Sequence, residues 1–467
     1  MSAEWPLVSL DQLVEFKTGK LDSNAAIDNG EYPFFTCSPT TLSIDKYAFD
    51  TEAVLLAGNN ANGIFPIKYY QGKFNAYQRT YVITPKGSQK LSTKWLYFRI
   101  KHVTAELQQM SVGSATKFLT KKILDAYQIL LPPLNVQEYQ SDVLWSIQNK
   151  IDLNAEINQT LEQMAQALFK SWFVDFEPVK AKIAALEAGG SEEDALLAAM
   201  QAISGTSLFD ADTSTASAAE QLGRLQAEQP EQYAELRATA ELFPAVMQDS
   251  ELGEIPERWE VSCIGDQVSA VGGGTPSTKN PVFWDGGDIN WTTPKDMSNL
   301  ADNVLIGTER RITSAGLGKI SSGLLPVDTV LMSSRAPVGY LALAKIPVAV
   351  NQGYIAMRCD QTLSPEFVIQ WCSANMDEIK NRASGTTFAE ISKKNFRMIA
   401  VVVPSATLTS AFSKQVRQLY LKIEMNAREA KTLAELRDIL LPKLLSGELS
   451  ITSAETRMSE AGEAAHV

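Results

Sequence analysis

The feature that most constrains the fold is an internal repeat, in which distant segments match at one offset. Residues Gly113–Lys122 resemble Gly385–Lys394, and Lys150–Ala155 resemble Lys422–Ala427, both at an offset of 272 in the numbering. In both copies an apolar, strand-like run follows the first match and ends at a proline, Pro132 or Pro404. One offset kept over so many positions favours duplication, whereas the alternative is two generic strand-then-helix units. The chain is therefore predicted to fold as two related halves.

The two halves also begin alike. Trp5 and Trp259 open similar segments, and Gly19 and Gly273 follow these tryptophans at the same spacing, so this match has an offset of 254. Because this offset is not 272, the loops that follow have different lengths in the two halves. A constant strand-and-helix unit after variable loops is the pattern expected if the helices must stay alike while the loops differ.

Two long helices are predicted after the matched strands, over residues 136–175 and 406–446. Proline is absent from both segments until Pro442, and apolar side chains recur at spacings of three and four, close to a heptad seam. A 40-residue helix would be about 60 Å long, too long to bury in one domain. We therefore expect an antiparallel coiled coil. Its predicted seam residues are Ile151, Asn154, Leu161, Leu168, Ile423, Asn426, Leu433 and Leu440.

Two features of these helices have alternative interpretations. Asn154 and Asn426 take equivalent seam positions, where a polar residue can fix the register at a cost in stability, although a merely imperfect seam would look the same. The segment Ala167–Phe176 is unusually aromatic for a helix end. It can anchor the helices on a globular half or form a docking surface for a partner.

The globular halves have the pattern of α+β domains. Short apolar runs such as Ala53–Ala57 and Tyr354–Met357 are bounded by Gly, Pro and Asn, which is typical of strands and turns, and short helices are expected near 94–107 and 365–382. The predicted fold class is α+β, with two pseudo-symmetric α/β domains separated by two long antiparallel helices. The expected boundaries are 1–135 and 251–405 for the domains, 136–178 and 406–448 for the helices, 179–250 for a helical insert, and 449–467 for a disordered tail.

The negative charge is concentrated in the insert. The whole chain carries −12, and residues 175–257 alone hold 17 acidic against 4 basic residues, a net charge of −13. Residues 1–135 and 258–405 carry +3 and +1, which permits local basic faces without requiring them. The insert is rich in Ala and Glu, so we expect short helices joined by flexible stretches such as 212–217. Its charge would repel DNA, so it should lie away from a duplex, as a connector or a protein-docking element.

Composition disfavours several classes of site. His102 and His466 are the only histidines, which argues against a histidine-rich metal site or a Ser-His-Asp triad, and His102 is expected to be structural. The four cysteines form no CxxC pair and fit reduced thiols. The glycines at 272–274 do not make a P-loop, because Lys279 is followed by Asn280. No apolar run reaches the roughly 18 residues of a membrane span, and no secretory signal opens the chain. A cytoplasmic protein without catalytic residues or a metal site is therefore predicted.

Polar loops between the strands are the candidate nucleic-acid contacts. Asn, Gln and Arg can bind base edges with two hydrogen bonds, and Ser, Thr and Lys suit phosphates. Any one such loop is more often only solvated, and a solvent-facing turn is the alternative for the paired lysines. The predicted DNA-binding residues are Lys20, Asn75, Arg79, Lys117, Lys121, Lys122, Thr275, Ser277, Lys279, Trp291, Arg335, Gln352, Lys393 and Lys394.

Several segments resemble the specificity (S) subunit of type I restriction-modification systems. They are Asp249–Trp259 (DSELGEIPERW), Leu168–Phe176 (LFKSWFVDF), Leu440–Glu448 (LLPKLLSGE), the loop Gly273–Ser277 and the segment Asp288–Thr292. The resemblance covers most of the chain outside the insert and tail. It implies two target-recognition domains, each binding half of a split DNA site, with the helices setting the distance between the half-sites. The acidic insert is longer than the family leads us to expect.

The same resemblance implies a non-catalytic subunit of a larger enzyme. Double-stranded DNA, two methyltransferase subunits and restriction or translocase subunits would be its partners, in a complex that acts as a site-specific deoxyribonuclease and DNA adenine methyltransferase. No cofactor is expected on this chain, since S-adenosylmethionine, Mg2+ and ATP would belong to the partner subunits. Two other functions stay open. A scaffold whose halves bind protein would show no sequence-dependent DNA affinity, and an enzyme acting alone would methylate or cleave without partners.

Overall fold

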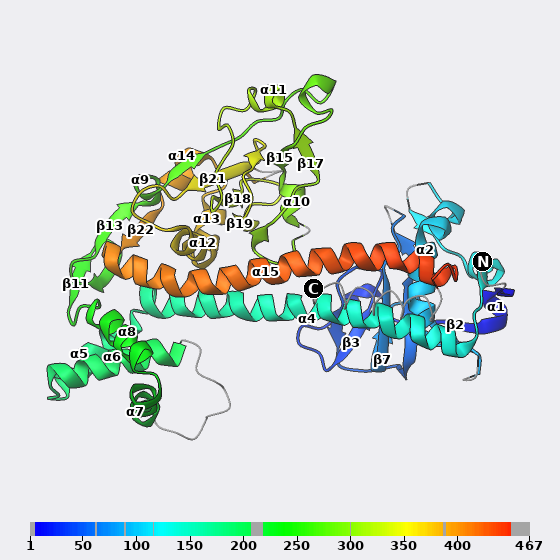
Figure 1. The fold of residues 1–467 in the computed structure, drawn as a ribbon, viewed down its shortest axis with the longest axis horizontal. Coiled ribbons are helices and arrows are strands. Elements are labelled where there is room, and N and C mark those ends of the chain that lie inside the picture. Colours follow the sequence, from blue (N-terminus) through cyan, green and yellow to red (C-terminus); the bar gives the residue numbers. More distant parts are fainter. Residues whose placement is uncertain are drawn as a thin grey trace, which may run out of the picture. The chain divides into compact units, whose positions relative to one another are not determined.

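The computed structural model describes residues 5–60, 63–87, 90–114, 116–206, 218–298, 300–385 and 389–449. The chain forms two compact units: unit 1 comprises residues 1–151 and 431–467, and unit 2 comprises residues 152–430. Helices α4 (Leu134–Phe173) and α15 (Ala406–Leu445) each contribute one part to each unit (Figure 1). The predicted disordered tail lies outside the described residues from position 450 onward.

Unit 1 contains a six-stranded sheet packed against helix α2. The strand order is β2-β8-β5-β7-β3-β4, and all neighbours are antiparallel except β3 and β7. The strands are β2 (Val14–Thr18), β3 (Tyr32–Phe35), β4 (Leu42–Ile44), β5 (Phe49–Ala57), β7 (Ile67–Ala76) and β8 (Thr80–Pro85). Helix α2 (Thr93–Met110) starts at Ser92, whose hydroxyl accepts a hydrogen bond from the Trp95 backbone. Its apolar face, including Trp95 and Phe98, fills the core of unit 1.

Smaller elements complete unit 1. Strand β1 (Leu7–Ser9) pairs antiparallel with β10 (Gln128–Leu130), so the strand that opens the domain lies beside the strand that leads into α4. The other elements are α1 (Leu10–Leu13), η1 (Ser23–Ala25), β6 (Asn59–Asn60), β9 (Lys117–Phe118) and α3 (Lys121–Ala126).

Unit 2 contains a second domain, built on two sheets. One has the order β14-β21-β18-β19-β16, and the other has the order β17-β15-β20, in which β15 and β20 are parallel. The strands are β14 (Ser269–Val271), β15 (Ile289–Thr292), β16 (Val304–Leu305), β17 (Arg310–Ile312), β18 (Val330–Ser333), β19 (Leu341–Ala344), β20 (Ala349–Val350) and β21 (Tyr354–Arg358). The helices are α9 (Ile264–Gln267), η2 (Pro281–Phe283), α10 (Pro294–Ser298), α11 (Ser314–Leu317), α12 (Pro365–Ala374), α13 (Met376–Asn381) and α14 (Lys393–Arg397).

The two domains share their strand pairing. The pair β13 (Glu260–Cys263) with β22 (Ala400–Val403) corresponds to β1 with β10, and β15 between β17 and parallel β20 corresponds to β3 between β4 and parallel β7. The helix caps Ser92 and Ser364 are related by the same offset of 272, so the repeat extends back to α2 and α12. The predicted α+β class with two related domains is confirmed.

The described part of the acidic insert, which omits residues 207–217, folds as four helices within unit 2. They are α5 (Glu177–Glu187), α6 (Glu192–Thr206), α7 (Ala218–Glu228) and α8 (Pro230–Glu241), followed by a hairpin of β11 (Met247–Ser250) and β12 (Gly253–Pro256). Val179 and Met200 are buried in a core that continues into the second domain. The ammonium of Lys182 donates to the carbonyl of Phe243 (2.6 Å), which satisfies its buried charge in part. The predicted flexible stretch 212–217 lies outside the described residues.

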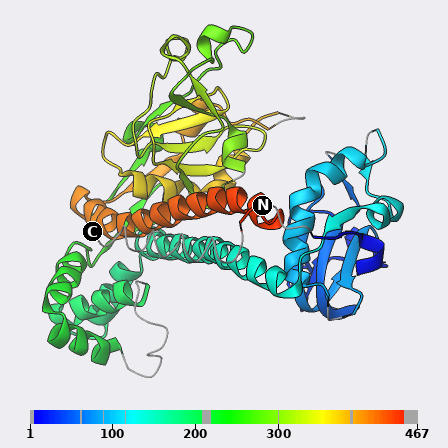
Figure 2. The ribbon, with the colours of Figure 1, turned by 45° about the vertical axis from the view of Figure 1, so that its right-hand side comes forward.

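Helices α4 and α15 are antiparallel neighbours in unit 2 (Figure 2). The Asn154 amide donates to the carbonyl of Asn426 (3.3 Å), and the Asn158 amide donates to that of Ile423 (3.2 Å). The Asn426 amide in turn donates to the Asn158 side-chain oxygen (2.8 Å). Residue numbers therefore rise along α4 as they fall along α15, which makes the two helices antiparallel. Asn154 contacts Asn426, its counterpart in the internal repeat.

The same antiparallel order is found in unit 1. Gln140 of α4 donates to the carbonyl of Leu444 (2.5 Å), and Arg437 of α15 donates to the side chain of Gln148 (2.7 Å). The buried apolar residues of this helix end, Leu441, Leu444 and Leu445, join the core of unit 1.

Candidate nucleic-acid interface

A glycine loop in unit 2 lies against the end of a parallel strand pair. A Cβ atom on Gly273 would fall 1.7 Å from the carbonyl oxygen of Val350 in β20, so only glycine fits there. In unit 1, Gly19 has the same relation to Ala76 at the end of β7, where the distance would be 1.6 Å. The two repeat glycines therefore serve one purpose: they let a polar loop approach the strand ends closely.

The loop after Gly273 brings predicted site residues together. The Thr275 hydroxyl donates to Oε1 of Gln352 (2.6 Å), and both side chains are exposed. Ser277 and Lys279 are exposed further along the same loop. These four polar side chains thus belong to one loop and the strand end beneath it, and their role in DNA binding stays a prediction.

Two tryptophans support this loop. Trp291 Nε1 donates to the carbonyl of Gly274 (3.1 Å), and Trp284 Nε1 donates to that of Ser277 (3.0 Å). Their rings meet edge to face, with centroids 5.1 Å apart. Trp291 is only 2% exposed, so its predicted role as a DNA contact was wrong: the indole fills the small core beneath the loop. The half-buried Trp284 is the member of the pair that reaches the surface.

Arg310 lies over this tryptophan pair, although the loop patterns of the sequence do not single it out. Its guanidinium carbon is 3.7 Å from the ring centroid of Trp284 and 5.4 Å from that of Trp291. The Lys319 ammonium is 5.9 Å from the ring of Phe283 in η2. Cations set against aromatic rings are typical of nucleic-acid-binding surfaces. The only indication of this site in the sequence is the pair of adjacent arginines, Arg310 and Arg311.

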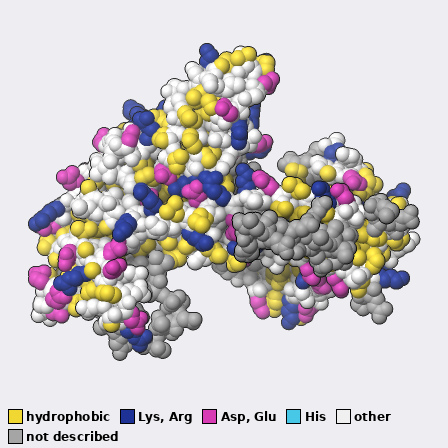
Figure 3. Space-filling model, in the orientation of Figure 1, with side chains coloured by type: hydrophobic (Ala, Val, Ile, Leu, Met, Phe, Trp, Pro, Cys, Tyr) yellow, Lys and Arg dark blue, Asp and Glu magenta, His cyan; other side chains and the backbone are white. Residues whose placement is uncertain are grey.

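We call this part of unit 2, residues 272–292 and 308–320, the tryptophan lobe. In Figure 3 the tip of the second domain, where α11 lies in Figure 1, shows Lys or Arg side chains beside hydrophobic ones. Elsewhere on the same face of that domain, basic and acidic side chains are interspersed. The cations of the lobe are therefore distinguished by their aromatic neighbours and not by a large excess of positive charge.

Further basic side chains of unit 2 lie at and near α14. The Lys393 ammonium would be 2.9 Å from a Cβ on Gly272, so this side chain covers the start of the glycine loop. Lys394 is exposed beside it, and Arg397 donates to the carbonyl of Ala270. The predicted contact Arg335 is in part neutralised, because its guanidinium lies 3.8 Å from the Glu390 carboxylate.

In unit 1, one predicted contact is a core residue. Asn75 is 5% exposed, its amide donates to the carbonyl of Lys46 (2.9 Å), and its oxygen accepts from the Ala76 backbone (2.9 Å). Both polar groups of the side chain are thus used inside the domain. The prediction that Asn75 contacts DNA was wrong, because its position in β7 points the amide inward.

The other predicted residues of unit 1 lie at its surface. Lys20 is exposed, and the exposed Arg79 lies 5.5 Å from the ring of Phe118. Lys117 is half-buried in β9. A further pair, which sequence patterns do not single out, places the Lys73 ammonium 4.9 Å from the exposed ring of Tyr47. Unit 1 therefore also sets cations against aromatic rings, with tyrosine and phenylalanine in place of tryptophan.

The repeated lysine pairs differ in their neighbours. Lys121 and Lys122 open α3 and are exposed, as Lys393 and Lys394 open α14. The Lys121 ammonium forms an ion pair of 2.7 Å with Asp125. At the repeat offset of 272, the counterpart of Asp125 is Arg397. The same short helix is thus more basic in unit 2 than in unit 1.

The predicted seam residues of α4 and α15 are buried to different extents. Asn154, Leu168, Ile423 and Asn426 of unit 2 are at most 3% exposed. Leu161 in unit 2, and Ile151, Leu433 and Leu440 in unit 1, are partly buried. The aromatic end of α4 is also covered: Phe169, Trp172 and Phe173 are buried in the core of unit 2 against the second domain. Of the two interpretations, an anchor therefore fits this segment and an exposed docking surface does not.

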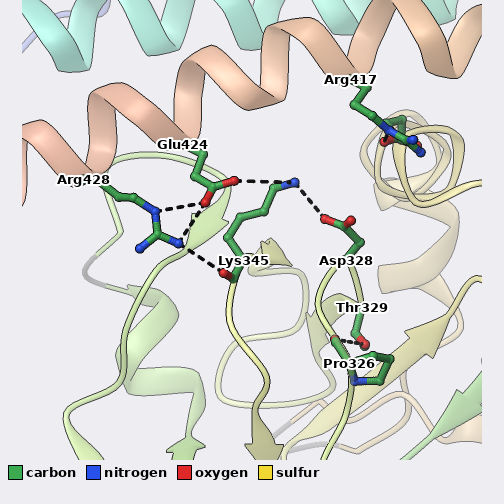
Figure 4. A network of polar contacts seen from close by, with 8 residues as sticks. Pro326, Asp328, Thr329, Lys345, Arg417, Glu424 and Arg428 are labelled. Atoms are coloured by element: carbon green, nitrogen blue, oxygen red, sulfur yellow. Dashed lines mark hydrogen bonds and ion pairs between the residues drawn. The ribbon is translucent and has the colours of Figure 1, made fainter.

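A polar network attaches the second domain to α15 (Figure 4). The Lys345 ammonium lies 2.7 Å from Asp328 and 3.9 Å from Glu424, and its side chain is only 6% exposed. Arg428 pairs with Glu424 (2.8 Å) and donates to the Lys345 carbonyl (3.2 Å). Because the lysine is nearly buried, loss of either carboxylate would leave part of its charge uncompensated.

Acidic groups define a different region of unit 2. A cavity of about 540 Å³ is lined by Glu156, Glu162 and Asp302, among others, and burial raises the pKa of Asp302 above its ordinary value. Carboxylates there would repel phosphate, which disfavours this cavity as a DNA contact. Among the residues that the structure describes, no three His, Cys, Asp or Glu side chains are grouped as metal ligands, and none of the helices has the length and hydropathy to cross a membrane.

Comparison with known proteins shows which family this chain resembles in sequence and fold. The model of the type I restriction modification DNA specificity domain matches residues 2–163 and 256–432. The chain is 34% identical over 379 residues to the type I restriction enzyme HindI specificity subunit of Haemophilus influenzae, in an alignment that covers 79% of this chain and 80% of that one. It is 40% identical over 172 residues to the EcoDI specificity subunit of Escherichia coli, 36% of either chain. The crystal structure of the S subunit from M. genitalium has a similar fold, with a TM-score of 0.52, 14% identity and coverage of 94% and 96%.

Proposed function

Because this chain belongs to the type I restriction-modification DNA specificity family, we propose that it binds one DNA target in two half-sites, one per domain. As a specificity subunit it is not itself catalytic. One observation carries the proposal of two half-sites: two domains have the same strand pairing around an equivalent glycine, yet they expose different side chains. A duplicated scaffold with different surfaces suits two different short sequences.

We assign the DNA contacts within each domain to the predicted residues that are exposed or half-buried. In unit 2 they are Thr275, Ser277, Lys279, Arg335, Gln352, Lys393 and Lys394, and in unit 1 they are Lys20, Arg79, Lys117, Lys121 and Lys122. The lysines would hold phosphates, and the glutamine and arginines would reach base edges. The loops around Gly19 and Gly273 would approach a groove of the duplex.

The helices and the partners complete the proposal. We infer that α4 and α15 set the number of unspecified base pairs between the half-sites, with Asn154 and Asn426 fixing their register. Two methyltransferase subunits and the restriction subunits would bind this chain in the cytoplasm and supply S-adenosylmethionine, Mg2+ and ATP. The acidic insert would stay away from the duplex, because its charge repels phosphate.

Methylation mapping tests the proposal. A host genome is sequenced for methylated adenines with and without this chain, in the presence of its methyltransferase subunit. We expect a motif of two short half-sites with a fixed gap, which disappears without the chain. A single contiguous motif, or methylation that does not depend on the chain, would contradict the proposed function. Inserting one heptad into both helices should change the gap and leave both half-sites intact.

A further inference from the structure

Most arginines of the second domain have an ion-pair or hydrogen-bond partner within the chain, although the ion pairs of Arg258 and Arg335 are longer than a hydrogen bond. The sequence has seven arginines within residues 258–405. Five of them contact an acidic side chain or a backbone carbonyl: Arg258 with Glu257, Arg335 with Glu390, Arg358 with Asp360, Arg382 with Glu378, and Arg397 with the Ala270 carbonyl. Within the described part of the chain, the guanidinium groups of Arg310 and Arg311 make no hydrogen bond or ion pair. These two therefore have both their charge and their donors available for another molecule.

Arg310 differs from Arg311 in being held in place. Its guanidinium carbon lies 3.7 Å from the ring centroid of Trp284, and Trp284 is itself tied to the Ser277 carbonyl. Trp291, fixed by the Gly274 carbonyl, supports the arrangement from below. The cation–π contact stabilises one position of an otherwise mobile side chain. Binding to Arg310 therefore loses less conformational entropy than binding to a free surface arginine.

Arg311 offers an internal contrast. It follows Arg310 in β17, and successive side chains of a strand point to opposite faces. Arg310 pairs in register with Trp291, whereas Arg311 pairs with Asn290 and has no aromatic contact among the described residues. Both side chains are exposed and carry the same charge. Any property that depends on the tryptophan pair should belong to Arg310 alone.

The planar shape of the Arg310 guanidinium favours a DNA base over a phosphate as its ligand. A phosphate contact needs only charge, and the ammonium groups of Lys279 and Lys319 provide it within the same lobe. A guanidinium fixed on an aromatic ring presents a planar fork of donors, which matches the two acceptors of guanine in the major groove. Adenine would require an amide and cytosine an acceptor, and Arg310 provides neither.

We propose that Arg310, positioned by Trp284 and Trp291, reads a guanine in the half-site bound by unit 2. The inference rests on the proposed function and names one specificity-determining residue for it. Unit 1 has Leu42 at the strand position of Arg310, since Leu42 pairs with Phe34 as Arg310 pairs with Trp291. The guanine contact would therefore be confined to one half-site.

The experiment uses the full chain assembled with its methyltransferase subunit. Methylated motifs and binding to a library of randomised duplexes are measured for the wild type and for Arg310→Ala. We expect a guanine at one position of one half-site, and a loss of its preference by roughly 5- to 150-fold in the variant. All other positions of the motif should be unchanged. Thermal unfolding of the complex checks that the variant is folded.

Two further variants separate base reading from charge. Arg310→Lys keeps the charge and should lose the guanine preference like the alanine variant, whereas Arg311→Ala removes the same charge and should leave the motif intact. An unchanged motif in Arg310→Ala, a uniform loss of affinity over all sequences, or a wild-type motif without guanine would overturn the inference. If the wild type itself gave no two-part motif, the proposed function would fail instead.

Discussion

Each unit fastens its long helices to a globular domain at the same repeat positions, but with different chemistry. In unit 1 the contact is a chain of hydrogen bonds. Trp95 Nε1 donates to Oε1 of Gln140 (2.7 Å), and the Gln140 amide donates to the carbonyl of Leu444 (2.5 Å). Trp95 and Gln140 are at most 1% exposed, so their polar groups have no access to water.

In unit 2 the corresponding positions form an aromatic cluster. The counterparts of Trp95, Gln140 and Leu444, at the offset of 272, are Phe367, Phe412 and Trp172. The Phe412 ring lies 5.8 Å from Trp172 and 6.4 Å from Phe367, edge to face in both cases. The repeat therefore preserves which positions touch, and not which interaction they make. At these three positions unit 1 uses directional hydrogen bonds, and unit 2 uses aromatic packing.

The largest effect is expected from Phe412→Ala. Truncation of a fully buried phenylalanine among four aromatic neighbours should lower the free energy of unfolding by about 3–5 kcal/mol, as measured by urea unfolding of the full chain. Met425→Ala on the same helix is the matched control, because Met425 is 64% exposed, and its effect should be near zero. Equal losses for the two variants would mean that the aromatic cluster does not hold the junction.

The next effect concerns a feature that the two units share. Gly273→Ala should cost about 3 kcal/mol, because its Cβ would clash with the Val350 carbonyl 1.7 Å away and the backbone must shift. Gly274→Ala is the control: its Cβ would come no nearer than 3.8 Å to its neighbours. Gly19→Ala should behave like Gly273→Ala, since the clash with Ala76 is equivalent. A harmless Gly19→Ala would show that the two glycine loops are not equivalent.

A smaller loss is expected from Gln140→Ala, of about 2 kcal/mol, because it leaves the buried Trp95 indole without an acceptor. The same urea titration applies. The sharper variant is the double change Trp95→Phe with Gln140→Leu, which gives unit 1 an apolar junction like that of unit 2. Since removal of both partners of a hydrogen bond can be nearly neutral, the double variant should be more stable than Gln140→Ala. A double variant that is less stable would show that the hydrogen-bond chain itself is required.

Periodicity and repetition predicted the scaffold well. The proline-free heptad pattern predicted helices at 136–175 and 406–446, and the structure has them at Leu134–Phe173 and Ala406–Leu445. Such patterns are local, because a helix buries a face that recurs every three or four residues. The offset between Gly113 and Gly385 likewise follows from local similarity, so it predicts two related domains without any information on strand pairing.

The candidate interface was harder to predict, because it depends on non-local pairing. The sequence alone does not distinguish Trp284 from Trp291. Trp291 is buried because it lies in β15, which is paired on both sides with β17 and β20. Asn75 is polar in sequence, yet the Lys46 carbonyl satisfies it inside the domain. Arg310 meets the indoles because it pairs with Trp291 across two strands that are not consecutive in the chain. A loop pattern alone does not show which side of a strand faces solvent.

The smallest expected effect separates the basic surfaces of the two units. If Lys393 neutralises one phosphate, Lys393→Ala should lower the slope of log affinity against log salt by about 0.9, as measured by DNA binding of the assembled complex over a salt series. Lys121→Ala should lower it less, because the Lys121 ammonium is paired with Asp125 at 2.7 Å, whereas the counterpart of Asp125 in unit 2 is Arg397. In a background that carries Asp125→Arg, Lys121→Ala should lower the salt slope by as much as Lys393→Ala does. Equal slopes for the two lysine variants in the unmodified background would mean that the ion pair does not weaken the hold of unit 1 on DNA.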